Sequence, residues 1–263
     1  MLARSWACAH PTAFGAGAAA LYLAPHLVPG LDVALGLLSL TPLGPVLPTL
    51  AWDVLIVVTV LALGRGTVTV GSVRGHSWCA WAAAACCGVV AAVVGGICGT
   101  AIALTLTDAA FASYQGALAS SPAWLTVLTT IAVAPVTEEL VFRGSLYCGL
   151  RRRWPALASG LVSAAAFALA HGTMTHVPVT IVLALASSAL VERSRSIWPS
   201  VALHATANLT TTFVVPMISV PAWLVSAPVA IGLWLAVTLG MVALLVVCSS
   251  RTERPHEAGI IED

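Results

Sequence analysis

The residues best suited to chemistry in this chain are two adjacent glutamates, Glu138 and Glu139, in a stretch that is otherwise apolar. Arg143 follows Glu139 by four residues, so the two side chains share one face of a helix and are expected to form a structural ion pair. Glu138 is rotated by about 100° from that face. This rotation frees it from the arginine and leaves it as the candidate working carboxylate.

Two further segments of the C-terminal half offer partners for Glu138. His171 follows Phe167 by four residues, and Asn208 follows His204 by four residues, so each pair shares a helix face. At a helical rise of about 1.5 Å per residue, these groups lie roughly 13 to 27 Å from the nearest arginine cluster. With tilt and loop slack, we expect the carboxylate, the two imidazoles and the amide to meet at one depth.

This set of groups suits hydrolysis of an amide by either of two routes. A carboxylate beside a histidine can activate water as a general base, and His204 with Asn208 can stabilise a developing oxyanion. Alternatively, Glu138, His171 and His204 could ligate one zinc ion that keeps an open position for water. The H-E-x-x-H zinc signature is absent, and no Ser/His/Asp or Cys/His set has comparable support.

The composition requires a membrane protein. The chain has 263 residues, of which 59% are hydrophobic and 8% are charged. Its charge-free runs are longer than the ~20 residues that a spanning helix needs. The net charge of +1 gives no indication of nucleic-acid binding. The chain has arginine but no lysine, which is typical of a GC-rich genome and favours a prokaryotic source. From this and the long apolar runs together, we expect an integral, multi-pass protein of the plasma membrane.

Proline, glycine and charge clusters divide the apolar sequence into about eight predicted helices. They cover 12–29, 47–64, 78–106, 122–150, 155–173, 177–191, 197–217 and 222–248. If both termini face the cytoplasm, ten of the eleven arginines fall on that side, as the positive-inside rule requires. Residues 31–46 are interpreted as a loop or a re-entrant piece, and 251–263 as a disordered cytoplasmic tail.

Other intramembrane features receive secondary interpretations. Asp53 is the one acid within a predicted span outside the motifs. A position near the outer interface would make its burial inexpensive, and a role in substrate entry is the less favoured interpretation. Gly95 and Gly99 form a small-residue pair that favours close helix packing. The segment Glu192–Arg195 is expected to be a compact polar linker between two spans.

The motifs resemble those of the CAAX protease and bacteriocin-processing (CPBP, or Abi) family of intramembrane proteases, similar to type II CAAX prenyl endopeptidases. The resemblance rests on Glu138-Glu139-x-x-x-Arg143, Phe167-x-x-x-His171 and His204-x-x-x-Asn208. It covers the predicted catalytic core, 122–212. The rest of the chain matches the family only in its general character. It is hydrophobic in residues 1–121 and in the last helix in 213–250, and polar in the tail in 251–263.

The resemblance implies an eight-helix fold and an endopeptidase that cleaves a membrane-associated or lipidated substrate. It also implies that Glu138 and His171 activate water, that His204 and Asn208 bind the oxyanion, and that Glu139, Arg143 and Phe167 support them. Whether one divalent metal such as zinc takes part stays open. Two other functions remain: a non-catalytic immunity or scaffold protein of the same fold, and a proton-coupled transporter.

Overall fold

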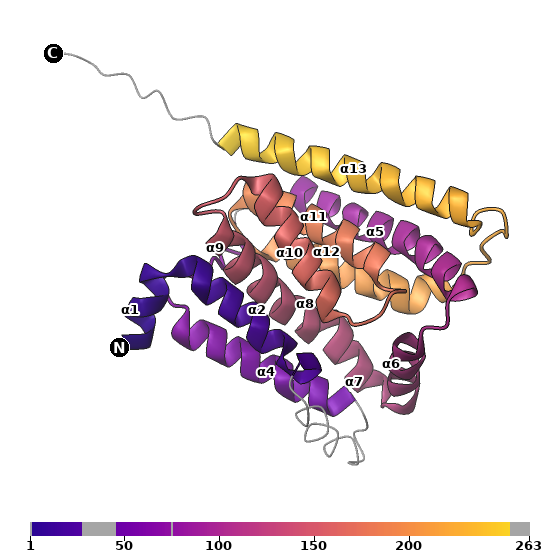
Figure 1. Cartoon of the computed structure of the whole chain (residues 1–263), viewed down its shortest axis with the longest axis horizontal. Helices are drawn as coiled ribbons and strands as arrows, with labels where there is room; N and C mark the ends of the chain where they lie inside the picture. The colour runs from indigo at the N-terminus through magenta and orange to yellow at the C-terminus, as the bar shows by residue number, and fades with distance from the viewer. Residues whose placement is uncertain (1, 28–45, 75, 253–263) are drawn as a thin grey trace.

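The computed structural model describes residues 2–27, 46–74 and 76–252, and within them every regular element is a helix (Figure 1). The all-α class predicted from the sequence is therefore confirmed. The elements are α1 (Leu2–Ala9), α2 (Pro11–Leu27), α4 (Val46–Leu63), α5 (Trp78–Thr105), α6 (Ala109–Ser120), α7 (Ala123–Val127), η2 (Leu128–Val133), α8 (Ala134–Glu138), η3 (Glu139–Tyr147), α9 (Cys148–Leu150), α10 (Ala156–Ala170), α11 (Val177–Ser194), α12 (Trp198–Leu209), η4 (Thr210–Val214), η5 (Val215–Met217) and α13 (Ala227–Thr252).

Each of the eight predicted apolar segments is occupied by helix. Five of the described helices are long and apolar enough to cross a membrane: Val46–Leu63, Trp78–Thr105, Ala123–Leu150, Val177–Ser194 and Ala227–Ser250. Ala156–Ala170 is apolar but shorter. The chain is thus an integral membrane protein, and the count of eight crossings stays a prediction. The predicted loop at 31–46 lies outside the described residues up to Val46, which begins α4, and the tail lies outside them beyond the end of α13.

The centre of the bundle is α11, which packs against α5, α10, α12 and α13. About 67% of the spanning window of α11 is buried, against 6% for α13, which lies along one edge (Figure 1). On α5, Gly95 lies against Val179 and Gly99 against the carbonyl of Thr175. A Cβ atom at either glycine would collide with these neighbours, so this small-residue pair sets the distance between α5 and α11.

The helix that carries the two glutamates is irregular. Two π-helical segments, η2 and η3, flank the short α8 that ends at Glu138. Pro135 contributes to this shape, because a proline ring clashes with the carbonyl of the fourth preceding residue, here Ile131 in η2. In η3 the hydroxyl of Ser145 donates to the carbonyl of Leu140, five residues earlier, at 3.0 Å. Such wide turns occur often at functional sites.

The expected polar linker at 192–195 is wrong for its first part. α11 continues to Ser194, and Glu192 is buried inside it. Its carboxylate accepts a hydrogen bond from the hydroxyl of Tyr147 at 2.7 Å and pairs with Arg151. The helix then stops because Arg195 adopts a left-handed conformation with φ 54°. The span predicted over 177–191 ended too early because Glu192, assigned to the linker, is neutralised within the bundle.

Helix α2 lies close to the helix of the glutamates. At Gly15 the backbone of α2 approaches the carbonyl of Ser145 and the Cα of Leu146 in η3. The carbonyl of Pro11 similarly approaches Gly149 in α9. These contacts between small residues allow a close backbone approach, and they bring the N-terminal half of the chain to the motif helices.

Candidate active site

A buried ion pair forms the foundation of the site. Nη1 of Arg143 lies 3.3 Å from Oε1 of Glu139, and both side chains have no exposure to solvent. The guanidinium carbon of Arg143 lies 4.5 Å from the centre of the Phe167 ring, which provides a cation–π contact. The spacing of four residues between Glu139 and Arg143 thus produces the expected pairing, and it leaves Glu138 outside the pair.

His204 lies between the two glutamates. Its Nδ1 is 3.1 Å from Oε1 of Glu139, and its Nε2 is 3.6 Å from Oε2 of Glu138. A carboxylate paired with Arg143 accepts rather than donates, so Nδ1 of His204 carries a proton. Nε2 then faces Glu138 with a lone pair in the neutral ring or with a second proton in the imidazolium. The sequence separated Glu138 from Glu139, whereas the structure connects them through His204.

His171 lies at the end of α10, against the ring of Phe167. Its Nδ1 is 3.0 Å from the carbonyl oxygen of Phe167, which can only accept, so Nδ1 donates and Nε2 is left with the lone pair in the neutral ring. The ring of Phe167 contacts the rings of His171 and His204 at centroid distances of 4.7 and 5.6 Å. Phe167 is therefore the apolar wall against which both histidines rest.

Asn208 lies one helical turn beyond His204, but its amide is already engaged. Nδ2 donates to the carbonyl of Thr130 in η2 at 2.8 Å. That carbonyl belongs to the wide turn before Pro135, so Asn208 connects α12 to the irregular part of the glutamate helix. One N–H of the amide remains for a substrate. The spacing predicted that the side chains of His204 and Asn208 point to the same place. The described structure shows no direct contact between these two side chains.

Two residues of the N-terminal half lie beside Glu138, and only one was singled out from the sequence. The hydroxyl of Tyr22, on α2, donates to Oε1 of Glu138 at 2.8 Å. Asp53, on α4, is 1% exposed, and its Oδ2 has no hydrogen-bond partner. Asp53 is therefore buried within the bundle, and its expected position near the outer interface stays a prediction. Tyr22 had a weak signal, as a hydroxyl in an apolar run.

The side chains offered for a metal do not gather as a ligand set. Within the described ranges, no three histidine, cysteine, aspartate or glutamate side chains lie together as a group that could hold a metal ion. Glu138 and His204 approach one another, but His171 turns its Nδ1 to the backbone of Phe167. The donors therefore do not fit a zinc ion in this arrangement.

A polar cluster lies next to His171. Oδ2 of Asp108 accepts from the backbone N–H and the hydroxyl of Thr175 at 3.0 and 2.9 Å, which fixes α6 to the loop before α11. These backbone hydrogen bonds hold the pKa of Asp108 below its usual value. The ring of His176 stacks edge-on with Tyr114 of α6 and with His171. Burial lowers the pKa of His176 to about 4, so it is neutral at physiological pH.

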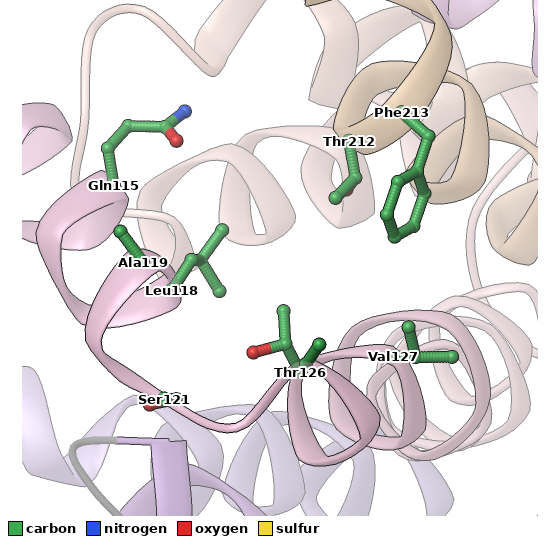
Figure 2. A pocket seen from close by; sticks show the side chains of 9 residues that line it. Gln115, Leu118, Ala119, Ser121, Thr126, Val127, Thr212 and Phe213 are labelled. Carbon is green, nitrogen blue, oxygen red and sulfur yellow. The ribbon is translucent and has the colours of Figure 1, made fainter.

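A pocket of about 360 Å³ opens between α6, α7 and η4 (Figure 2). Its lining is mostly apolar and includes Leu118 of α6, Val127 of α7 and Phe213 of η4. Thr212 also lines it, one helical turn beyond Asn208, and Thr126 lines it one turn before the Thr130 carbonyl that Asn208 holds. The pocket is therefore next to the Asn208 side of the site.

The comparison with protein families concerns the part of the chain that holds all three motifs. The comparisons with curated proteins and with solved structures found no match. Residues 120–210 match the family model described as Rce1-like, type II CAAX prenyl endopeptidase, which confirms the resemblance drawn from the motifs.

Proposed function

We propose that the protein is an intramembrane endopeptidase that hydrolyses a peptide bond of a membrane-associated or lipidated substrate. The observation that carries the proposal is the approach of the Glu138 carboxylate to the His204 imidazole, at 3.6 Å, inside the segment that matches prenyl endopeptidases. A scaffold gains nothing from a buried carboxylate that lies outside the Arg143 ion pair, because burial of such a charge costs several kcal/mol.

In the proposed reaction, Glu138 is the general base. It removes a proton from a water molecule while the oxygen of that water attacks the scissile carbonyl carbon. The lone pair on Nε2 of His171 assists by accepting a hydrogen bond from the same water. When the tetrahedral intermediate collapses, the proton on Glu138 passes to the leaving amine nitrogen as the C–N bond breaks. The Glu138 carboxylate is thereby restored, and the proton taken from water is carried away on the amine product.

The oxyanion of the intermediate requires a donor on the opposite side. Nδ1 of His204 is engaged by Glu139, so Nε2 can donate only when His204 is an imidazolium. The free N–H of Asn208 is the second proposed donor. Donors of this kind are worth about 10²- to 10³-fold in rate.

The substrate class follows from the position of the site and from the family match. The site is enclosed by membrane helices, so its substrate must approach from the bilayer or from its surface. The name of the matched family specifies a prenylated substrate, and we propose a membrane-anchored peptide for this chain. The apolar pocket next to Asn208 would take an apolar side chain of that peptide.

The test is peptide cleavage by the purified protein in lipid nanodiscs. A peptide library with and without a C-terminal prenyl group is compared for the wild type, Glu138→Gln, His204→Gln and Glu192→Gln. Glu192→Gln is the matched control, because it also removes a buried carboxylate but one that contacts Tyr147 and Arg151. We expect the rate to fall about 10²- to 10⁴-fold in Glu138→Gln and to remain near that of the wild type in the control.

Two results would contradict the proposal. One is an undiminished rate in folded Glu138→Gln, which would remove Glu138 from the chemistry. The other is the absence of cleavage by the wild type together with a cellular phenotype that Glu138→Gln retains, which is the result expected of a scaffold. Metal content measured on the same samples decides the zinc alternative, since stoichiometric zinc that is lost with His204→Gln would establish a metal site.

A further inference from the structure

Exposed arginines gather at one end of the helical bundle, in the loops that follow α4, α9 and α11 and in the last turn of α11. No step of the proposed reaction uses them. We call this surface the basic face. Its six exposed arginines are Arg65, Arg74, Arg152, Arg153, Arg193 and Arg195.

The three loops are packed into one surface. The backbone N–H of Ile197, in the loop after α11, donates to the carbonyl of Val70, in the loop after α4, at 3.1 Å. Gly71 approaches the loop after α11 so closely that a Cβ atom there would collide with its backbone. From the loop after α9, Nη2 of Arg152 donates to the carbonyl of Thr67 at 3.5 Å. The positive-inside rule places arginine in each loop separately and does not require such packing, so the shared surface is a property of this fold.

The basic face has no exposed acid to neutralise it within the described ranges. The acids of these ranges are Asp53, Asp108, Glu138, Glu139 and Glu192. All but Asp108 are buried, and Asp108 lies beyond the far end of α5, away from the loop after α4. Glu192 is in the last turn of α11 beside the face, but it pairs with Arg151. The six exposed guanidinium groups therefore present a positive surface that suits an anionic partner.

The position of the face identifies the partner as lipid. Four of the five helices that can span a membrane begin or end at these loops: α4, α5, Ala123–Leu150 and α11. Two tryptophans border the face, Trp78 at the start of α5 and Trp154 before α10, and 88% and 45% of their surface is exposed. Tryptophan at the ends of spanning helices lies at the level of lipid headgroups. Arginines at this level can form charge-assisted hydrogen bonds with headgroup phosphates.

We infer that the basic face is a binding site for the phosphate headgroups of anionic membrane lipids. The inference does not depend on the proposed peptidase function. The loop after α4 is also joined to the helix of the glutamates, because the backbone N–H of Thr69 donates to the carbonyl of Gly144 at 2.9 Å. A headgroup bound between the loops would therefore stabilise the packing around η3 as well, since a ligand that binds only the folded state raises its stability.

The test is native mass spectrometry of the full-length protein in detergent, titrated with phosphatidylglycerol or with phosphatidylcholine of the same acyl chains. One exposed arginine of each loop region is replaced in the triple variant Arg74→Gln, Arg153→Gln and Arg193→Gln. The matched control is Arg74→Lys, Arg153→Lys and Arg193→Lys, which keeps the charge. Each arginine or lysine near an anionic headgroup contributes about fivefold in affinity.

We expect the wild type to bind phosphatidylglycerol at least about tenfold more tightly than phosphatidylcholine. The glutamine triple variant should bind phosphatidylglycerol about 10²-fold more weakly than the wild type, and the lysine triple variant should retain most of the affinity. The unfolding midpoint measured with phosphatidylcholine shows whether the triple variant folds. If it does not, the single variant Arg74→Gln should show a loss of about fivefold.

Three results would overturn the inference. One is equal affinity of the wild type for the two lipids, and another is an unchanged affinity of the folded glutamine variants for phosphatidylglycerol. The third is displacement of phosphatidylglycerol by a soluble anion. Displacement by inorganic phosphate at equal concentration would indicate a site for free anions. Displacement by a peptide of ten glutamates would indicate a docking surface for an acidic protein segment.

Discussion

Removal of Arg143 should be among the most destabilising single changes in this protein. Its guanidinium is fully buried, lies 3.3 Å from Glu139 and rests over the Phe167 ring. In Arg143→Met, the apolar stem is retained but the carboxylate of Glu139 is left buried without a permanent positive charge beside it, next to His204. Breaking a buried pair by removing one partner costs about 3 to 5 kcal/mol. We therefore expect a decrease of that size in the free energy of unfolding.

The assay is a reversible unfolding titration in mixed micelles, with four proteins: the wild type, Arg143→Met, Glu139→Gln and the double variant. Replacing both charged partners removes the orphaned charge, so the double variant should recover most of the loss caused by Arg143→Met. Its residual deficit would reflect the hydrogen bond to His204 and the cation–π contact. A single variant that loses less than about 1 kcal/mol, or a double variant as unstable as the single one, would refute the reasoning.

Three further outcomes are expected. Gly15→Val should displace α2 from η3 and lower both stability and activity, whereas Gly17→Val on the same helix meets no atom within 4 Å and should be close to neutral; equal unfolding midpoints would contradict this. Asn208→Ala should free the Thr130 carbonyl and lower kcat about 10²- to 10³-fold if Asn208 is an oxyanion donor. The polar cluster of Asp108, Tyr114, Thr175 and His176 should become less stable in acid. The depressed pKa of His176 makes its stabilisation decline as pH falls from about 6.5 to about 4, which hydrogen exchange of α6 would show and which constant protection would disprove.

Much of the fold was predictable because lipid imposes a simple requirement on sequence. Each apolar run bounded by proline, glycine or arginine became a helix, and the motif pairs four residues apart fell on common helix faces. The Glu139–Arg143 pair followed from this local rule alone. The end of α11 did not, because Glu192 is neutralised by Tyr147 and Arg151 from another helix, and no local pattern carries that information.

The second limit concerns the site itself. Spacing relates residues on one helix, and it identified the carboxylate, both histidines and the amide. Which neighbours these groups meet depends on how helices pack. Contact between Tyr22 and Glu138 requires that Gly15 bring α2 against η3, and the position of His204 between two glutamates requires the register of α12.

The wide turns around Glu138 also constrain how the length of the chain can vary. A π-helical turn holds about one residue more than an α-helical turn. Deletion of a single residue from η2 or η3 would therefore tighten that turn into an ordinary helix without breaking it. The part beyond the deletion would keep its rotation about the helix axis, because the turn loses only the residue that it holds in excess. A one-residue deletion from a regular helix such as α12 would instead rotate the part beyond it by about 100° and turn its side chains away from their present partners.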